Sequence, residues 1–321
     1  MPHVVGFLSN KLTLRGSEIA MYDYAHFNEV LLKNKSIIIT RDYNRVAREP
    51  DSNIEAYQKF QNRFTVEYYQ NNQDIDNIVE TYGLTHLYII KGGTNDGLMT
   101  TKCKNLIHCV FYASEKHGQV YSVISDDVNR IYKTNYPVVP HMIHNHETTE
   151  NLRETFSIPK DAIVFGRYGG METFDIQFVH NAIRNVLNER NDVYFLFMNT
   201  NKFYDHPRIL YLDGTTNMEY KKRFINTCDA LLHARHQGET FGLTCGEFAI
   251  ECKPVITFSE SKERNHIQIL GDHAVLYSDY DSIHEILLHW KNGTYSMISN
   301  GYLHYNPENV MKIFDSVYLQ S

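Results

Sequence analysis

Residues 162–198 read A-I-V-F-G-R-Y-G-G-M-E-T-F-D-I-Q-F-V-H-N-A-I-R-N-V-L-N-E-R-N-D-V-Y-F-L-F-M. The apolar run Ala162–Gly166 predicts a buried strand, and Val193–Met198 predicts a second one. Between them, apolar residues recur at helical spacing from Ile176 to Leu187, which predicts an amphipathic helix. A helix that separates two buried strands is typical of a mostly parallel sheet in an α/β fold.

The same alternation of strands and helices continues along the whole chain. It predicts two similar α/β layers in tandem, without a close sequence repeat, and ligands are expected at the carboxyl ends of their strands. Further strands are predicted at Val4–Leu8, Ile37–Thr40, Phe64–Tyr69, His86–Ile90, Leu106–Tyr112, Ile209–Leu212, Ala230–Ala234 and Pro254–Phe258. Further helices are predicted from Ser17, over Asp74–Tyr82 with Gly83 at its end, over Met218–Asn226 and over Pro307–Leu319.

Length and charge exclude one broad class of function. The 321 residues suffice for one large domain or two ordinary ones. The 31 Lys and Arg and 38 Asp and Glu give a formal net charge of −7. Residues 1–145 hold 15 of each sign, so the whole excess of negative charge lies in the second part. A general nucleic-acid binder needs a basic surplus, which neither part has, so any phosphate must be bound locally.

The expected location is the cytoplasm. The longest apolar runs are far shorter than a bilayer crossing, so no transmembrane segment is predicted. The first six residues lack the basic region of a signal peptide. The five cysteines include no Cys-x-x-Cys pair, which favours a reducing compartment over a disulfide framework or a structural zinc site.

The strongest functional signal lies in residues 234–256, which read A-R-H-Q-G-E-T-F-G-L-T-C-G-E-F-A-I-E-C-K-P-V-I. Glu239 and Glu247 are separated by seven residues. The intervening Phe241-Gly242-Leu243 predicts a turn that enters a helix. The N-terminus of a helix presents free backbone N–H groups and the positive end of its dipole, which suits a phosphate or sugar hydroxyl groups.

This segment, with Pro254-Val255-Ile256 after it, resembles the signature of family 4 of the retaining, GT-B-type glycosyltransferases. Three further stretches resemble other points of that family. Arg15-Gly16-Ser17-Glu18 corresponds to its turn after the first strand, residues 139–143 (V-P-H-M-I) to its segment between the domains, and Phe165-Gly166-Arg167 to the Gly-Arg pair after the first strand of its donor domain.

The resemblance implies a GT-B architecture with two Rossmann-like domains facing a cleft. Residues 1–146 would form the acceptor-side domain, residues 147–305 the donor domain, and residues 306–321 a helix that packs back on the first domain. The implied activity is retaining, metal-independent transfer of a hexose from a nucleotide diphosphate sugar, UDP-glucose first, to a glycan or glycoconjugate hydroxyl. A nucleotide-sugar hydrolase or epimerase of the same fold, or a non-catalytic nucleotide-sugar-binding module, remain alternatives.

The resemblance also implies roles for individual residues. Glu239 would hold hydroxyls of the donor sugar, Glu247 the ribose, and Arg167 the diphosphate leaving group. The backbone of Phe241, Gly242, Leu243 and Thr244 would face the sugar and diphosphate, and Gly16 and Ser17 would open a helix toward the phosphate cleft. Glu239, Arg167 and His108 are the candidate catalytic residues, and no residue is assigned to a metal.

Two features leave alternatives open. The family usually has a Lys six residues after the Arg, but this chain has Thr173 there, so Arg235, Lys262 or Arg264 would have to supply the second cation. His108, in an apolar run, competes with His117, in the loop after it, as the acceptor-side histidine. The glycine-rich stretch Gly92–Gly97 lacks the ending of a P-loop and is interpreted as a loop on the rim of the cleft.

Overall fold

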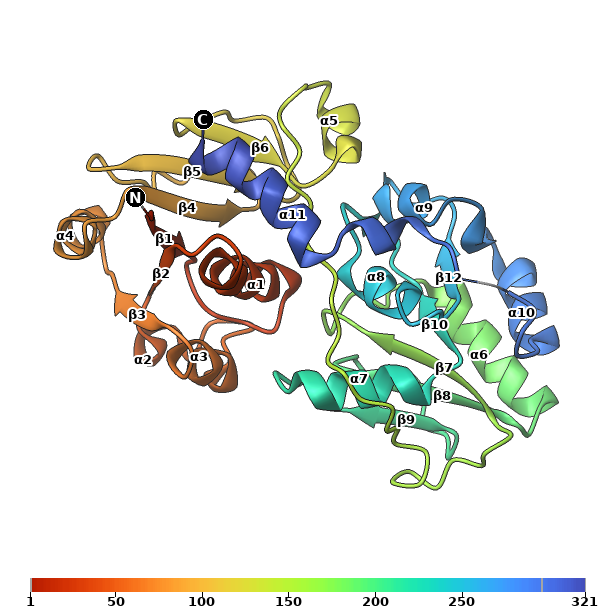
Figure 1. Ribbon diagram of the computed structural model, residues 1–321. Coiled ribbons are helices and arrows are strands. Elements are labelled where there is room, and N and C mark those ends of the chain that lie inside the picture. Colours follow the sequence, from red (N-terminus) through yellow and green to blue (C-terminus); the bar gives the residue numbers. More distant parts are fainter. Residues whose placement is uncertain (1, 296, 321) are drawn as a thin grey trace. The chain divides into compact units, whose positions relative to one another are not determined.

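The computed structural model describes residues 2–295 and 297–320. The chain forms two compact units. Unit 1 comprises the residues up to Met142 together with those from Tyr305 onward, and unit 2 comprises Ile143–His304. The last helix, α11 (Pro307–Phe314), therefore belongs to the unit that contains the start of the chain, as its blue ribbon in Figure 1 shows.

Unit 1 is built on a six-stranded sheet in the order β3-β2-β1-β4-β5-β6. All its neighbouring strands pair in parallel. From β1 to β3 each new strand is added on one side of β1, and from β4 to β6 each is added on the other side, so the strand order reverses between β1 and β4. Its strands are β1 (Val4–Leu8), β2 (Lys35–Thr40), β3 (Thr65–Tyr68), β4 (His86–Lys91), β5 (Lys104–Cys109) and β6 (Val120–Val123); its other helices are α1 (Gly16–Val30), α2 (Tyr43–Val46), α3 (Ile54–Gln61), α4 (Asn72–Tyr82) and α5 (Asp126–Tyr132).

The boundaries of α4 follow from its sequence. Asn71 accepts a hydrogen bond from the backbone N–H of Asp74, and Asp74 accepts one in return, which forms a capping box at the N-terminus. Gly83 ends the helix with φ at +61°, a left-handed conformation that glycine adopts without strain. The predicted end of this helix is therefore confirmed.

Helix α11 is attached to unit 1 by aromatic packing. Phe314 lies 5.2 Å from Tyr24 of α1, 5.5 Å from Tyr88 of β4 and 6.3 Å from Phe7 of β1, measured between ring centroids. All four rings are buried. The chain then continues to Leu319 in wider turns of the π type. Burying these rings stabilises the return of the chain to unit 1.

Unit 2 repeats the same architecture. Its six strands lie in the order β14-β12-β10-β7-β8-β9, again with all neighbours parallel and with the reversal between β10 and β7. The strands are β7 (Ile163–Tyr168), β8 (Val193–Met198), β9 (Ile209–Leu212), β10 (Ala230–His233), β12 (Val255–Phe258) and β14 (Ala274–Tyr277). The helices are α6 (Gln177–Glu189), α7 (Met218–Thr227), α8 (Leu243–Ala249), α9 (Asn265–Leu270) and α10 (Tyr280–His289). Two strands of two residues each, β11 (Gly238–Glu239) and β13 (Glu263–Arg264), pair separately in parallel.

The prediction of two parallel α/β layers is confirmed, but some elements were missed. Strands β6 and β14, the two-residue strands β11 and β13, and helices α2, α3, α5, α9 and α10 were not predicted. Strand β5 ends at Cys109, three residues before its predicted end, because the N–H groups of Phe111 and Tyr112 turn to bind the carbonyl of Gly92. Within the described residues, no helix combines the length and the apolar character needed to cross a membrane.

Candidate functional site

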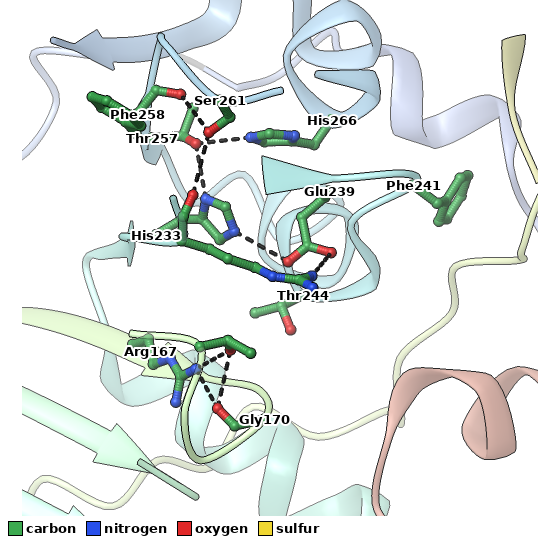
Figure 2. Close-up of polar contacts among 12 residues, drawn as sticks. Arg167, Gly170, His233, Glu239, Phe241, Thr244, Thr257, Phe258, Ser261 and His266 are labelled. Carbon is green, nitrogen blue, oxygen red and sulfur yellow. Dashed lines mark hydrogen bonds and ion pairs between the residues drawn. The ribbon is translucent and has the colours of Figure 1, made fainter. Parts of the chain in front are cut away.

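Unit 2 places the predicted residues at the carboxyl ends of its two central strands. Arg167 lies at the end of β7, and Glu239 lies in the segment that follows β10. These strands pair in parallel at the point where the strand order reverses. In open α/β sheets this is where ligands usually bind. Figure 2 shows the side chains that gather here.

The Glu239 carboxylate is held by two basic side chains. Arg235 Nη1 lies 3.0 Å from Glu239 Oε2, and His233 Nε2 lies 3.3 Å from Oε1. Burial alone would raise the pKa of Glu239, but the charge of Arg235 and the hydrogen bond from His233 lower it to about 2. The carboxylate is therefore ionised at neutral pH. With a quarter of the side chain exposed, it can still accept hydrogen bonds from the hydroxyl groups of a sugar.

A threonine links His233 to a second histidine. Thr257 Oγ1 lies 2.9 Å from His233 Nδ1 and 2.8 Å from His266 Nε2 (Figure 2). The hydroxyl has one hydrogen, so it donates to one ring and accepts from the other. Burial lowers the pKa of His266 to about 3, so this ring is neutral at physiological pH. Thr257 thus sets the orientation of the His233 ring that faces Glu239.

Glu247, the second carboxylate of the motif, is nearly enclosed in α8. Lys221 Nζ of α7 lies 2.5 Å from its Oε1, and the Tyr168 hydroxyl donates to its Oε2. The Lys221 and Glu247 side chains are only 8% and 6% exposed. Each charge therefore depends on the other, because a buried charge without a partner is strongly destabilising.

Arg167 is clamped by neutral groups. Its Nη1 donates to the carbonyl of Asn199 and the hydroxyl of Thr200, and its Nη2 donates to the carbonyl of Gly170 and, over 2.6 Å, to the hydroxyl of Thr173. Burial lowers the pKa of Arg167 to about 10, which leaves the guanidinium charged at neutral pH. Thr173 stands where the resemblance leads us to expect a Lys, and its hydroxyl binds the neighbouring cation instead.

The turn into α8 has the shape that the sequence predicts. Gly242 adopts φ +85°, and a Cβ there would lie 2.9 Å from His266 Cβ, so both the backbone and the packing require glycine. The Phe241 carbonyl accepts a hydrogen bond from the Tyr302 hydroxyl over 2.6 Å, and the Phe241 ring points away from Glu239 in Figure 2. Leu243 begins the helix, and Thr244 donates to the carbonyl of Tyr168 over 3.3 Å.

The three cations considered as substitutes for the missing Lys have different positions. Arg235 is paired with Glu239. Lys262 is exposed to solvent. Arg264 is also exposed and lies 3.8 Å from Glu260. Arg235 therefore contacts Glu239 through its side chain, and Arg264 is the backbone neighbour of Glu239 across β11 and β13.

Gly16 and Ser17 begin α1 in unit 1, where Ser17 lines a pocket with Glu18. Ser17 donates to Glu18 over 3.0 Å. Glu18 also accepts hydrogen bonds from the hydroxyls of Ser9, at 3.2 Å, and Thr13, at 2.5 Å. The predicted turn therefore places a hydroxyl, that of Ser17, where it donates to a buried carboxylate of unit 1.

The two candidate histidines of unit 1 are both buried. His108 has no exposed surface, and its Nδ1 lies 2.7 Å from the Tyr88 hydroxyl. Burial lowers the pKa of His108 to about 3. His117 is 7% exposed, and its Nδ1 contacts the carbonyl of Glu115 at 2.6 Å. His141, in the segment that the resemblance places between the domains, is buried as well and meets the edge of Tyr24.

Four residues of this region were missed by the sequence reasoning, namely Lys221, His233, Thr257 and His266. For His233 and Thr257 a signal existed, since each is a polar residue in a buried apolar strand, near its carboxyl end. Lys221 lies 26 residues from Glu247, and His266 lies on α9, nine residues after its partner Thr257 on β12, so no pattern within one element indicates them.

Solved structures of similar fold cover almost the entire chain. A glycosyltransferase from Rickettsia africae is 13% identical, with 99% of this chain and 95% of that chain covered and a TM-score of 0.64. HepE from Anabaena, solved with UDP and glucose, is 12% identical over 98% and 95%, with a TM-score of 0.68. Sucrose-phosphate synthase from Thermosynechococcus elongatus is 11% identical over 98% and 95%, with a TM-score of 0.61.

The fold is that of GT-B-type glycosyltransferases. The fold class predicted from the sequence is thereby confirmed. No family model matches the chain, and no curated protein matches it in sequence.

Proposed function

We propose that the chain is a retaining glycosyltransferase of the cytoplasm that moves a hexose from a nucleotide diphosphate sugar to a hydroxyl of a glycan or glycoconjugate. The GT-B fold and the resemblance of residues 234–256 to family 4 support this proposal. UDP-glucose is the first donor to try. The five cysteines are all free thiols, which is consistent with a reducing compartment.

The observation that carries the proposal is the ionised carboxylate of Glu239 at the carboxyl ends of the central strands. Arg235 and His233 hold it in place, and Thr257 orients His233. A fixed, partly exposed carboxylate can bind sugar hydroxyls without reorganising, and such positioning is a main source of catalysis in group transfer.

We assign Arg167 to the diphosphate. Its hydrogen-bond acceptors are all neutral in the part of the chain that the structure describes, so its positive charge is not cancelled by a bonded carboxylate. In a buried setting this charge acts over a longer range than it would in water. It would stabilise the negative charge that develops on the leaving diphosphate, together with the first backbone N–H groups after Gly242.

We assign Glu247 to the nucleotide ribose. Its carboxylate accepts from Lys221 and Tyr168, and ribose hydroxyls would add to these bonds, because each carboxylate oxygen has two lone pairs. Gly16 and Ser17, which begin α1, would face the acceptor. His108 is enclosed among aromatic rings, and we propose a structural role for it rather than proton transfer.

Transfer assays with a panel of UDP- and GDP-sugars test the proposal, with mass spectrometry of the products and NMR of the new anomeric centre. Sugar transferred with its configuration retained supports it. Free sugar and nucleotide without transfer supports the hydrolase alternative, an altered sugar stereocentre the epimerase, and binding without turnover the binding module. Because we propose that no metal is needed, activity should survive EDTA.

Glu239→Gln keeps the shape of the side chain but removes its charge. We expect kcat/KM to fall by about 100-fold or more, the scale seen when one fixed polar contact to a transition state is lost. Glu260→Gln is the matched control, because that carboxylate is 63% exposed. Absence of binding to every nucleotide sugar, with no effect of Glu239→Gln, would overturn the proposal.

A further inference from the structure

Unit 1 contains a pocket of about 350 Å³ that lies entirely within that unit. It opens where β1, β4 and β5 end, beside the reversal of strand order between β1 and β4. Its volume lies in the lower part of the range of small-ligand sites. It therefore has room for a ligand of about the size of a monosaccharide.

The charges on the pocket wall are balanced. Lys11, Arg15 and Lys91 contribute three positive charges, and Glu18, Asp51 and Asp96 contribute three negative ones. Arg15 binds Asp51 through Nε and Nη2, both at 2.9 Å, and Lys91 Nζ binds Asp96. A phosphate or carboxylate ligand needs surplus positive charge, which this wall does not offer.

A buried carboxylate lies on this wall. Glu18 is 8% exposed and accepts hydrogen bonds from the hydroxyls of Ser9, Thr13 and Ser17 and from its own backbone N–H. No ion pair to Glu18 exists within residues 2–295 and 297–320, so this carboxylate would repel an anionic ligand. These bonds fill the acceptor positions of the carboxylate, but the Ser17 hydroxyl lines the pocket, and its oxygen can still accept from a hydroxyl of a ligand.

The glycine-rich stretch also lines the pocket, through Gly92, Thr94 and Asp96, and holds an aromatic ring there. Gly93 adopts φ +134°, and a Cβ would lie 2.1 Å from the Tyr112 carbonyl oxygen, so only glycine allows this close approach. The contact fixes the segment that carries Phe111, which lines the pocket and is 38% exposed. From the same stretch, Asp96 Oδ1 accepts from Lys91 Nζ and from the Leu98 N–H. Asp96 Oδ2 keeps its acceptor capacity for a ligand.

We propose that this pocket binds an uncharged carbohydrate, through hydroxyl contacts to Ser17, which Glu18 orients, and to Lys91 and Asp96, and through packing of the apolar face of the sugar ring on Phe111. Paired acceptors and donors suit hydroxyl groups, which both donate and accept. This inference rests on the proposed function and deepens it, because it gives the chemical class of the acceptor as a neutral sugar rather than a phosphorylated or acidic one.

Saturation-transfer NMR on the full chain tests this proposal with four neutral probes and two charged ones. The neutral probes are the methyl glycosides of glucose, galactose, mannose and N-acetylglucosamine, and the charged ones are glucose 6-phosphate and glucuronate. We expect at least one neutral glycoside to bind at millimolar concentration and to bind at least tenfold more tightly than either charged sugar. Tighter binding of a charged sugar, or binding of no neutral glycoside, would overturn it.

Two variants localise the binding. Phe111→Ala and Glu18→Gln should each lower the affinity for the neutral glycoside by about tenfold or more. Tyr68→Ala, at a 39% exposed tyrosine that does not line the pocket, should leave it unchanged. Circular dichroism checks that each variant is folded. If the folded variants all bind as the natural chain does, the glycoside lies elsewhere and the proposal fails.

A parallel titration with UDP separates this inference from the proposed function. UDP binding that survives in Phe111→Ala, while glycoside binding is lost, supports both. UDP binding without any glycoside binding overturns the pocket assignment alone. Glycoside binding without any UDP or UDP-sugar binding overturns the proposed donor function but leaves the neutral-sugar site standing.

Discussion

Lys221 and Glu247 form an ion pair inside unit 2, with 2.5 Å between Lys221 Nζ and Glu247 Oε1. They come from α7 and α8 and lie 26 residues apart in the chain. The Tyr168 hydroxyl, at the end of β7, completes the environment of the carboxylate. Three elements of the unit therefore meet at the residue that we assign to the ribose.

Lys221→Met should destabilise unit 2, because it leaves the Glu247 charge buried without its partner. We expect a loss of about 3–5 kcal/mol in the free energy of unfolding, measured by denaturant titration. Adding Glu247→Gln removes the stranded charge, so the double variant should regain most of the loss. A double variant no more stable than Lys221→Met would show that the two charges are not coupled.

Glu239 should make the stability of unit 2 depend on pH in the acid range. Its pKa is about 2 in the folded chain, below the usual value of about 4.3 for an exposed Glu. A lowered pKa gives stability that is complete above the unfolded value and is lost as the pH falls toward the folded value. The advantage of the natural chain over Glu239→Gln, on the order of a few kcal/mol, should therefore disappear between about pH 4 and pH 2. A difference that stays constant over this range would contradict the ion pair with Arg235.

Thr257→Val tests the link between the two histidines. The valine has the same shape, but it leaves His233 Nδ1 and His266 Nε2 without their shared hydroxyl. We expect about 1–3 kcal/mol of lost stability and a clear fall in kcat, because His233 no longer holds one orientation against Glu239. Thr257→Ser restores the hydroxyl and should recover both readouts, which a purely steric effect would not explain.

Thr173→Lys restores the cation that the family usually has. The new ammonium should tighten binding of UDP, measured by calorimetry, by about tenfold, the effect of one charge-assisted contact. The chain without nucleotide should become less stable, since Arg167 loses a hydrogen bond of 2.6 Å and gains a like charge nearby. Thr173→Val removes the hydroxyl alone and should lower the stability without tightening UDP binding. Unchanged UDP affinity in Thr173→Lys would place the diphosphate away from the Arg167 loop.

His108 should govern the stability of unit 1 and not the chemistry. Its pKa is lowered to about 3 in the folded chain, against about 6.5 unfolded. The unfolded chain therefore takes up a proton first, and stability falls as the pH drops from about 6.5 toward 3, by about 1.4 kcal/mol per pH unit for this group. His108→Gln should flatten that slope and cost a few kcal/mol of packing, while kcat per folded molecule is retained. A folded variant with kcat reduced 100-fold would instead assign His108 to catalysis.

Much of the fold could be predicted from the order of local patterns. The apolar runs of β1, β2, β4, β7, β8 and β12 are long enough to stand out, and the helix that Gly83 ends has its own cap signals. The short β6 was missed because Ser122 interrupts its apolar residues, and α10 was missed because only Ile283 and Leu287 of this helix are buried. Whether such segments form a strand or a helix depends on the sheet against which they pack.

The sequence by itself determined the two α/β layers and the Glu239–Glu247 motif, because both depend on the spacing of residues that lie close together in the chain. Only the tertiary structure decided what surrounds the motif. It paired Glu247 with Lys221, joined Glu239 to His266 through His233 and Thr257, and enclosed His108 in a core. These contacts join residues from separate elements, and their effect depends on burial, which sets the strength of each charge and is a property of the folded chain alone.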